Sequence, residues 1–311
     1  MIDLDDVRAA ARRIDGYVRR TPLLPATQFR NPVCAGSLHL KLECLQPSGS
    51  FKARGAANKL LASDPKDVER GLVAASGGNH GLAVARSASL KNVPATIFLP
   101  ENVQAEKVDK MRRWGAETVI GGANFDEANA GAHAYVEKTG ALYFHSFADP
   151  LIVAGQGTVG LEIFDDLPDV ETVVIAVGGG GFITGAAVAL KALKPSIRII
   201  GVEPVGSPTL HASLKAGHVV TLDQVTSNVP TMACQRTDER LFALTRQVVD
   251  EVVLIEDAAM EAAAKQLWFE FGLAADSSGA AAMAALATGS ISTRDNEIVC
   301  APVCGAGLPP L

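Results

Sequence analysis

The chain has 311 residues, of which 48% are hydrophobic and 20% are charged, a composition typical of a globular protein rather than a disordered one. The formal net charge of −6 leaves no basic surface suited to nucleic acid or to anionic lipid. Five cysteines without a CxxC pair argue against a zinc site and against a disulfide framework.

The first residues, among them Asp3, Asp5 and Asp6, are unlike a signal peptide, and no stretch of about eighteen apolar residues follows that would span a membrane. Cysteines without a pairing pattern suit a reducing compartment. We therefore expect a cytoplasmic protein that binds neither nucleic acid nor a membrane.

Apolar residues at helical spacing predict an opening helix from Leu4 to Val18, after acidic residues that favour a helix N-terminus. Short β-branched runs then alternate with Ala-rich helical stretches. These runs are hydrophobic along nearly their whole length, as parallel strands covered on both faces are. The predicted strands span residues 72–75, 96–99, 118–120, 173–177, 197–202, 252–255 and 298–303. Because the helical stretches between them fit βαβ crossovers, the sequence predicts an α/β fold.

Lys52 is the first residue with candidate chemistry, and it lies in a run of small residues directly after Phe51. Such a setting suits a buried amine with a lowered pKa, which is able to form a Schiff base. Taken alone, a lysine is more often a solvated surface charge. Lys52 therefore becomes a candidate only together with the loops that follow.

Residues 76–80 read Ser-Gly-Gly-Asn-His, between the predicted strand 72–75 and a predicted helix over 81–90. Exposed backbone amides at a helix N-terminus, together with Asn79, suit the binding of a carboxylate. The alternative is a helix cap with a tight turn, since serine and asparagine are common capping residues.

Four consecutive glycines, 178–181, follow the predicted strand 173–177 and precede a helical stretch over 184–193. Without side chains, their N–H groups can converge on an anion at the helix N-terminus. The alternative is a flexible turn, which four glycines make costly in conformational entropy. No acidic residue stands in the position expected for a ribose partner, which argues against a dinucleotide.

Together these three segments resemble the fold-type II pyridoxal-phosphate enzymes, and among them the threonine dehydratase and serine racemase branch, from about Lys41 to the C-terminus. Further matching pieces are residues 155–158 and 202–204, which we expect to be strand and loop. The resemblance implies a tryptophan synthase β-like fold with two open twisted parallel-sheet domains and the active site between them. We expect a large domain over 1–66 and 142–311, a small domain over 67–141, and a homodimer.

The same resemblance assigns roles to individual residues. Lys52 is the Schiff-base residue for pyridoxal 5'-phosphate and the general base that removes the α-proton, while Phe51 packs beside the cofactor ring. The tetraglycine loop binds the cofactor phosphate, and Asn79 bonds the phenolic oxygen. The phosphate loop consists of Gly178, Gly179, Gly180 and Gly181, and the substrate carboxylate site of Ser76, Gly77, Gly78, Asn79 and His80.

Cys304 follows the last predicted strand, in a Cys-Gly-Ala-Gly turn where the family usually has Ser or Cys followed by Gly-Gly-Asn. The resemblance makes Cys304 the partner of the pyridine nitrogen. A thiol is a weak and neutral partner, which makes a weaker electron sink and favours elimination at Cβ over transamination. The alternative is that Cys304 is only a small buried residue.

Some positions depart from the family pattern. Racemases of this branch carry a serine as second acid or base where this chain has Gly77, so we expect no racemisation. Glu203 matches the first ligand of the branch's divalent-cation site, but Ser207 and Thr209 replace the later positions, so we expect no metal. Further differences near the substrate are Asp276, the stretch His145-Ser146-Phe147, and Gly307 in place of the final asparagine. The substrate therefore need not be threonine.

The resemblance implies a pyridoxal-phosphate-dependent dehydratase, or ammonia-lyase, of amino-acid catabolism. We expect it to eliminate water from a β-hydroxy amino acid such as threonine, serine, 3-hydroxyaspartate or phenylserine, giving a 2-keto acid and ammonia. The alternatives are a β-replacement synthase, an amino-acid racemase and a non-enzymatic cofactor-binding protein. Arg54-Gly55 after Lys52 argues against the synthase, whose branch usually has an aspartate there. We expect no isoleucine-binding regulatory domain after the Cys304 turn.

Overall fold

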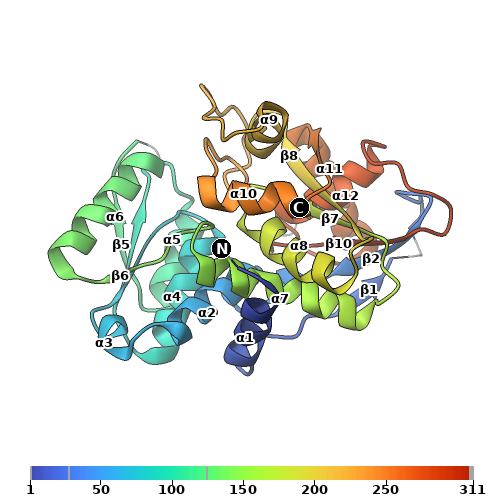
Figure 1. Ribbon diagram of the computed structural model, residues 1–311. Coiled ribbons are helices and arrows are strands. Elements are labelled where there is room, and N and C mark those ends of the chain that lie inside the picture. The colour runs from blue at the N-terminus through green and yellow to red at the C-terminus, as the bar shows by residue number, and fades with distance from the viewer. Residues whose placement is uncertain (1, 27–28, 124, 308–311) are drawn as a thin grey trace.

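The computed structural model describes residues 2–26, 29–123 and 125–307, which form two β-sheets surrounded by helices (Figure 1). The larger sheet has the strand order β1-β2-β10-β7-β8-β9 and the smaller β5-β4-β3-β6, and every neighbouring pair is parallel except β1 and β2. The strands are β1 Leu23–Pro25, β2 Ser37–Lys41, β3 Leu72–Ala75, β4 Ala95–Leu99, β5 Glu117–Ile120, β6 Leu142–Tyr143, β7 Thr172–Ala176, β8 Arg198–Pro204, β9 Glu251–Ile255 and β10 Ile298–Pro302. The predicted α/β fold with two parallel-sheet units is confirmed.

Most of the helices join consecutive parallel strands, as βαβ crossovers require. They are α1 Leu4–Ile14, α2 Lys52–Ala62, α3 Pro65–Val68, α4 Asn79–Lys91, α5 Ala105–Arg113, α6 Phe125–Thr139, α7 Pro150–Asp166, α8 Gly181–Leu193, α9 Thr209–Ala216, α10 Glu239–Val248, α11 Asp257–Phe271 and α12 Ser277–Ala287. Two short 3₁₀ turns, η1 Glu43–Leu45 and η2 Pro47–Gly49, precede α2. None of the helices in the described part of the chain has the length and apolar character needed to cross a bilayer.

The two central strands of the smaller sheet, β3 and β4, are covered on both faces, which explains why they are almost entirely apolar. In β3, Leu72 and Ala74 belong to the core shared with α4 and α5, whereas Val73 and Ala75 belong to the core shared with α6. Successive side chains of a strand point to opposite faces, so each face of β3 buries its own pair.

Helix α2 connects the two halves of the molecule, because it packs against α4 of the small-sheet unit and against α7 of the large-sheet unit. The contact with α7 is close: a Cβ on Gly155 would lie 2.6 Å from the Cα of Gly55. A Cβ on Gly157 would likewise lie 2.8 Å from the carbonyl oxygen of Gly185 in α8. The expectation of strand and loop at residues 155–158 was therefore wrong, because these residues lie inside α7, where the glycines allow close helix packing.

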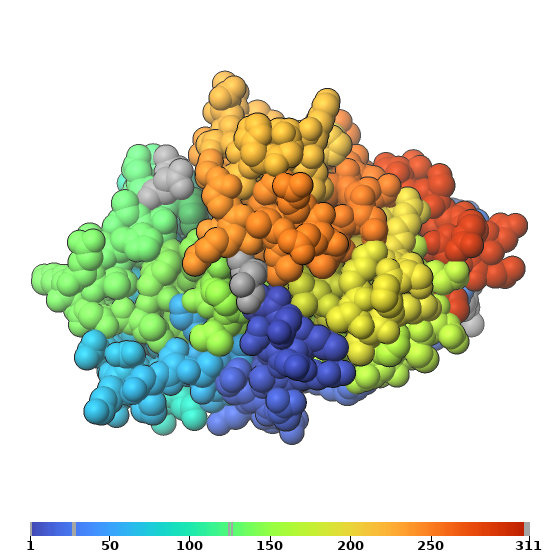
Figure 2. Space-filling model, viewed as in Figure 1, coloured from blue at the N-terminus to red at the C-terminus, as the bar shows by residue number. Residues whose placement is uncertain are grey.

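Helix α1 begins as expected, because the Asp3 and Asp6 side chains form a capping box with the backbone amides of the first turn. It ends at Ile14 rather than at the predicted Val18, since Gly16 adopts a positive φ of 74°. It packs against α2, α7 and α8, and Figure 2 shows it, in dark blue, on the surface where the small-sheet and large-sheet parts meet.

The predicted strands all occur, with ends that shift by one or two residues. Three strands were missed: β1 and β6 are too short to give a pattern, and β2 alternates apolar with polar residues (Ser-Leu-His-Leu-Lys). The smaller sheet spans Leu72 to Tyr143, because β6 pairs with β3. The expected domain limits, with the small domain over residues 67–141, stay a prediction.

Candidate active site

Lys52 is the first residue of α2, and the segment before it is joined to the turn after β10. The amide of Phe51 donates to the carbonyl of Cys304 at 3.2 Å, and Ser50 forms an isolated bridge with Gly305. The residues around positions 52 and 304, from opposite ends of the chain, therefore share one site, as the resemblance predicted.

The Lys52 side chain is half-buried, and its Nζ donates to the carbonyl oxygen of Ser146 at 2.6 Å. Burial lowers the pKa of Lys52 to about 8, although nearby thiols at Cys304 and Cys234 oppose the shift. A neutral amine is the nucleophilic form, so this lysine is much closer to reactivity at neutral pH than a surface lysine is. The surface-charge alternative does not fit this environment.

The tetraglycine loop connects β7 to α8, and Gly180 caps the helix with a φ of 93°, a conformation that favours glycine. A Cβ on Gly179 would lie 2.2 Å from the Phe147 ring, and one on Gly181 would lie 2.4 Å from the Phe147 carbonyl. Both positions therefore require glycine because Phe147 packs on them. The loop still presents the unpaired amides of a helix N-terminus, which is a favourable place for a phosphate.

The loop at residues 76–80 connects β3 to α4, and the helix begins at Asn79 instead of the predicted residue 81. Asn79 and His80 thus lie in its first turn, which presents unpaired backbone amides at the site. The Gly78 amide donates to the Ser76 hydroxyl at 3.2 Å, so Ser76 stabilises the turn itself. The alternative of a serine or asparagine cap is wrong, since the helix is capped by Gly78 without a side-chain hydrogen bond, although the tight turn that it included is present.

His80 is buried and neutral. Its Nε2 donates to the Phe144 carbonyl at 2.9 Å, and its Nδ1 is buried without a hydrogen-bond partner among the described residues. Burial, followed by the charge of Lys52, lowers the pKa of His80 to about 3. His80 therefore offers a carboxylate its backbone amide rather than a positive charge.

Asn79, Asp276 and Cys304 converge at the other end of the site. The Asn79 amide nitrogen donates to Asp276 at 3.1 Å, and a Cβ on Gly305 would lie within 2.9 Å of both of these side chains. The Cys304 thiol donates to the Ser278 carbonyl at 3.3 Å, and burial followed by the Asp276 charge raises its pKa above the ordinary value. Cys304 is thus a neutral thiol near Asp276, although it is also well packed in the core.

The sequence did not single out Phe182, and it named Phe147 only as part of a stretch that departs from the family pattern near the substrate. Phe182, in the first turn of α8, stacks on the Phe51 ring at 4.1 Å between centroids and 17° between planes. Phe147 covers the tetraglycine loop. An isolated phenylalanine does not stand out in a sequence. Only the run of four glycines indicated that another group packs closely against that loop. The place of Phe51 beside the cofactor ring stays a prediction.

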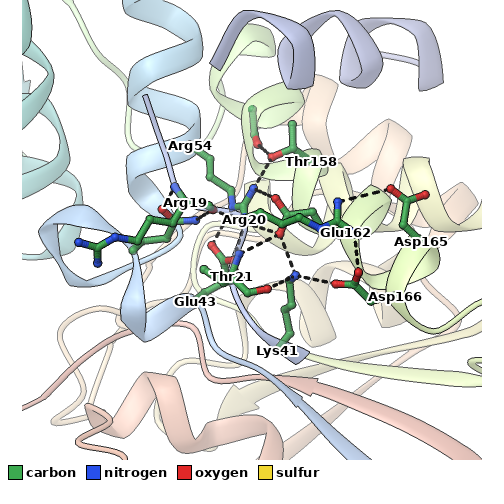
Figure 3. Close-up of polar contacts among 12 residues, drawn as sticks. Arg19, Arg20, Thr21, Lys41, Glu43, Arg54, Thr158, Glu162, Asp165 and Asp166 are labelled. Atoms are coloured by element: carbon green, nitrogen blue, oxygen red, sulfur yellow. Dashed lines mark hydrogen bonds and ion pairs between the residues drawn. The ribbon is translucent and has the colours of Figure 1, made fainter. Parts of the chain in front are cut away.

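Arg54 and Glu203 lie outside this cluster. Arg54 points into a buried group of ion pairs with Glu43 and Glu162 (Figure 3). Both Glu203 oxygens accept backbone amides at the start of α9, from Leu210 and His211, each at 2.8 Å. Within the described residues, no group of three His, Cys, Asp or Glu side chains is arranged to hold a metal ion.

Comparisons with known proteins agree with this geometry. A family profile described as pyridoxal-phosphate dependent enzyme matches residues 14–305. The L-threonine ammonia-lyase of Thermotoga maritima is 40% identical over 286 residues, which cover 92% of this chain and 71% of that protein. The structure of maize serine racemase superposes with a TM-score of 0.94 at 32% identity, covering 98% of this chain and 94% of the other. The structure of a threonine deaminase from T.th. superposes with a TM-score of 0.90 at 34% identity, covering 98% of both chains. The chain therefore belongs to the pyridoxal-phosphate-dependent enzymes of fold type II, in the branch that contains threonine deaminases and serine racemases.

Proposed function

We propose that this enzyme is an ammonia-lyase that removes water from a β-hydroxy amino acid and releases a 2-keto acid and ammonia. The similarity to L-threonine ammonia-lyase supports this reaction class. The similarity to serine racemase makes racemisation the main competing activity. The side chains around Lys52 favour the first of these two activities.

The site residues fit pyridoxal phosphate. Lys52 supplies an amine with a pKa of about 8, and the amides at the α8 N-terminus supply an anion site at the tetraglycine loop. Asn79 and Cys304 supply neutral polar groups at the other end of the site. When bound, the cofactor withdraws electrons from the substrate Cα and so makes the Cα–H bond acidic.

The residues of this chain have separable tasks in the proposed reaction. The Lys52 Nζ holds the cofactor covalently and, once free, takes the proton from the substrate Cα. The Ser146 carbonyl accepts a hydrogen bond from this Nζ and so fixes its direction. The first-turn amides of α4 hold the substrate carboxylate. The proton taken from Cα would balance the hydroxide that leaves from Cβ, so that one water is released, and one water would then be consumed when the enamine is hydrolysed to the keto acid and ammonia.

The observation that carries the proposal is the environment of Gly77, where racemases of the branch have a serine. Gly77 has no side-chain proton to move, and a Cβ there would already lie 3.0 Å from Val103 Cγ2. His80 and His145 do not replace the missing base: burial, then the Lys52 charge, lowers their pKa values to about 3 and about 4. With Lys52 acting alone as the base, removal of the α-proton leads to elimination rather than to inversion.

The decisive experiment incubates the purified holoenzyme with a panel of β-hydroxy amino acids and measures keto acid, ammonia and recovered substrate together. We expect keto acid and ammonia in equal amounts, and none of either from Lys52→Ala. Inversion of the recovered substrate without keto acid would instead identify a racemase. Net consumption of an added thiol would identify a β-replacement synthase.

A further inference from the structure

The segment between α9 and α10, residues 217–238, contains neither helix nor strand (Figure 1). Irregular segments longer than about 12–15 residues are uncommon inside a compact domain and usually carry a function. This one is well anchored, because Val229 and Met232 in its middle are buried. Its middle therefore has a fixed place in the structure.

Thr231, at the centre of this segment, contacts both of the glycine loops of the site. A Cβ on Gly78, in the loop of the small-sheet unit, would lie 3.3 Å from Thr231 Cγ2. A Cβ on Gly178, in the loop of the large-sheet unit, would lie 3.0 Å from the Thr231 carbonyl oxygen. Thr231 thus lies between the loop proposed to hold the substrate carboxylate and the loop proposed to hold the cofactor phosphate.

A tight turn sets the position of Thr231. The amides of Met232 and Ala233 donate to the carbonyl of Val229 at 2.9 and 3.0 Å. On the N-terminal side, the carboxylate of Asp257 accepts the amide of Asn228 at 2.6 Å. Thr231 therefore sits on a turn that is held before and after it.

Two buried hydroxyls hold the C-terminal side of this turn. The Ser207 hydroxyl oxygen accepts a hydrogen bond from the amide of Cys234 at 3.0 Å. The same hydroxyl has two carbonyl acceptors within reach, that of Cys234 at 3.0 Å and that of Met232 at 3.3 Å. Thr209 donates to the same Cys234 carbonyl. Both hydroxyl residues are at most 1% exposed. Glu203 binds the first amides of α9 and so fixes the helix on which Thr209 stands.

Met232, the residue after Thr231, also lies at the loop proposed to hold the cofactor phosphate, since a Cβ on Gly178 would lie 3.4 Å from its Cα. Thr231, with Met232 after it, therefore forms a wall beside the two glycine loops. A substrate whose carboxylate lies at the loop of residues 76–80 and whose Cα lies near Lys52 must place its Cβ substituent near this wall.

We propose that Thr231 is a specificity-determining residue that limits the size of the group on the substrate Cβ, and that Ser207 and Thr209 are positioning residues that hold it there. The inference rests on the proposed function, because it uses the same substrate orientation. Threonine is β-branched and stiff at χ1, so it forms a firmer wall than glycine or serine. Serine and threonine, with hydrogen or methyl on Cβ, are preferred over phenylserine.

The first test compares kcat/KM for serine, threonine and phenylserine in the holoenzyme and in Thr231→Gly. One group of methylene size changes selectivity by roughly 10- to 200-fold, so the ratio of phenylserine to serine should rise at least about tenfold. Thr221→Gly is the matched control, because Thr221 lies on an exposed part of the same segment, where its hydroxyl accepts a hydrogen bond from Arg236. An unchanged ratio in Thr231→Gly overturns the proposal. If this variant does not fold, Thr231→Ser answers the same question through the threonine-to-serine ratio.

Failure of the proposed function gives a different result. If no amino acid of the panel yields a keto acid, the same selectivity is read from the change in cofactor absorbance on titration with serine and with phenylserine. If the dissociation constant for phenylserine relative to serine changes in Thr231→Gly, the role of Thr231 in limiting the Cβ substituent is supported even without elimination. If this ratio does not change, that role is rejected.

The second test asks whether Ser207 positions Thr231 or only stabilises the fold. Ser207→Ala should raise the ratio of phenylserine to serine in the same direction as Thr231→Gly, since the amide and the carbonyl of Cys234 lose their hydrogen bonds to the Ser207 hydroxyl. Thr172→Val is the matched control, because it also removes a buried hydroxyl. That hydroxyl donates to Glu297 at 2.5 Å and lies where β7 pairs with β10. Both variants should lower Tm. If both also leave the ratio at the wild-type value, Ser207 has a structural role alone and the positioning claim fails.

Discussion

The guanidinium group of Arg54 forms paired hydrogen bonds with the carboxylate of Glu43, 2.8 Å from Nε and 2.7 Å from Nη2, where both side chains are excluded from solvent (Figure 3). Its remaining donors bind Glu162 at 2.7 and 2.9 Å, and Glu162 is also 2.7 Å from the Lys41 amine. Burial alone would lower the pKa of Arg54, but the Glu43 charge and the hydrogen bonds that Arg54 donates to both glutamates raise it above its ordinary value. Arg54, which argued against a β-replacement synthase in the sequence, thus joins η1, α2 and α7.

The first prediction concerns this ion-pair group. Arg54→Met should lower the free energy of unfolding by about 3–5 kcal/mol, because it leaves the fully buried Glu43 carboxylate without its cationic partner. Urea denaturation followed by circular dichroism measures the loss. Arg20→Ala is the control: it removes an ion pair with Asp166 at the half-exposed edge of the group, which is worth less than about 1 kcal/mol. A loss in Arg54→Met no larger than in Arg20→Ala would contradict the prediction.

The second prediction uses the pKa of Lys52, which burial lowers to about 8 from 10.5. Only the neutral amine attacks the cofactor aldehyde, and the neutral fraction rises with pH until the pKa is passed. In the cofactor-free enzyme, the rate of cofactor capture should therefore rise through a midpoint near pH 8 and then level off. Stopped-flow absorbance across a pH series measures this rate.

A free lysine derivative, measured with the same cofactor, provides the reference for an ordinary amine. Its midpoint should lie about two pH units higher than that of the enzyme, given an ordinary lysine pKa of about 10.4. Equal midpoints would mean that the Lys52 amine is solvated in the cofactor-free enzyme.

The sequence alone predicted the elements whose physical signal is local. Strands such as β3 and β4 are apolar throughout because helices cover both faces, and this pattern distinguishes them from the polar segments around them. Lys52 and the tetraglycine loop were predicted in the same way, from short unusual strings. The structure brings these two strings together through one segment, because Ser146 bonds the Lys52 amine and the next residue, Phe147, packs on Gly179.

What the sequence could not predict depends on contacts between distant segments. Phe147 covers the tetraglycine loop and Thr231 lies between two loops, but the residues next to them in the chain do not reveal these contacts. The structural role of Arg54 could not be predicted for the same reason, because its partners Glu43 and Glu162 come from other elements. Short-range patterns give element type, whereas the partner of a side chain follows only from the packing of the whole chain.

The third prediction concerns Glu203, whose pKa burial raises to about 8 from 4.5, although two backbone amides oppose the shift. Between these two values the folded state keeps a proton that the unfolded state releases. Raising the pH through this window therefore lowers the free energy of unfolding, by at most about 1.4 kcal/mol per pH unit for this one group. The stabilisation that comes from the bound proton is complete below pH 4.5, decreases as the pH rises and is gone once the pH has passed about 8.

Glu203→Gln isolates this contribution, because glutamine does not titrate. The difference in unfolding free energy between the wild type and Glu203→Gln should shrink steadily from about pH 5 to about pH 8, as measured by urea denaturation at each pH. A difference that is constant over this range would show that Glu203 is already ionised at its acidic end and that its two amide bonds outweigh its burial.

The last prediction concerns Gly77, the position at which racemases of the branch carry a serine. Gly77→Ser places a hydroxyl in the loop at residues 76–80, so the recovered substrate should contain both enantiomers, at a rate at least about tenfold above that of the wild type. Because a Cβ at this position would lie 3.0 Å from Val103 Cγ2, the change is best made together with Val103→Ala. Chiral chromatography of serine after partial conversion measures the inversion.

Gly77→Ala with Val103→Ala is the matched control, since it brings the same crowding without a hydroxyl. It should leave the recovered serine in its original configuration while keto acid still forms. If the wild type itself inverted serine as fast as it released keto acid, a second base would have to be present, and the assignment of Lys52 as the base that acts alone would fail. Inversion that appears only with the hydroxyl would instead show that a single missing side chain separates elimination from racemisation on this fold.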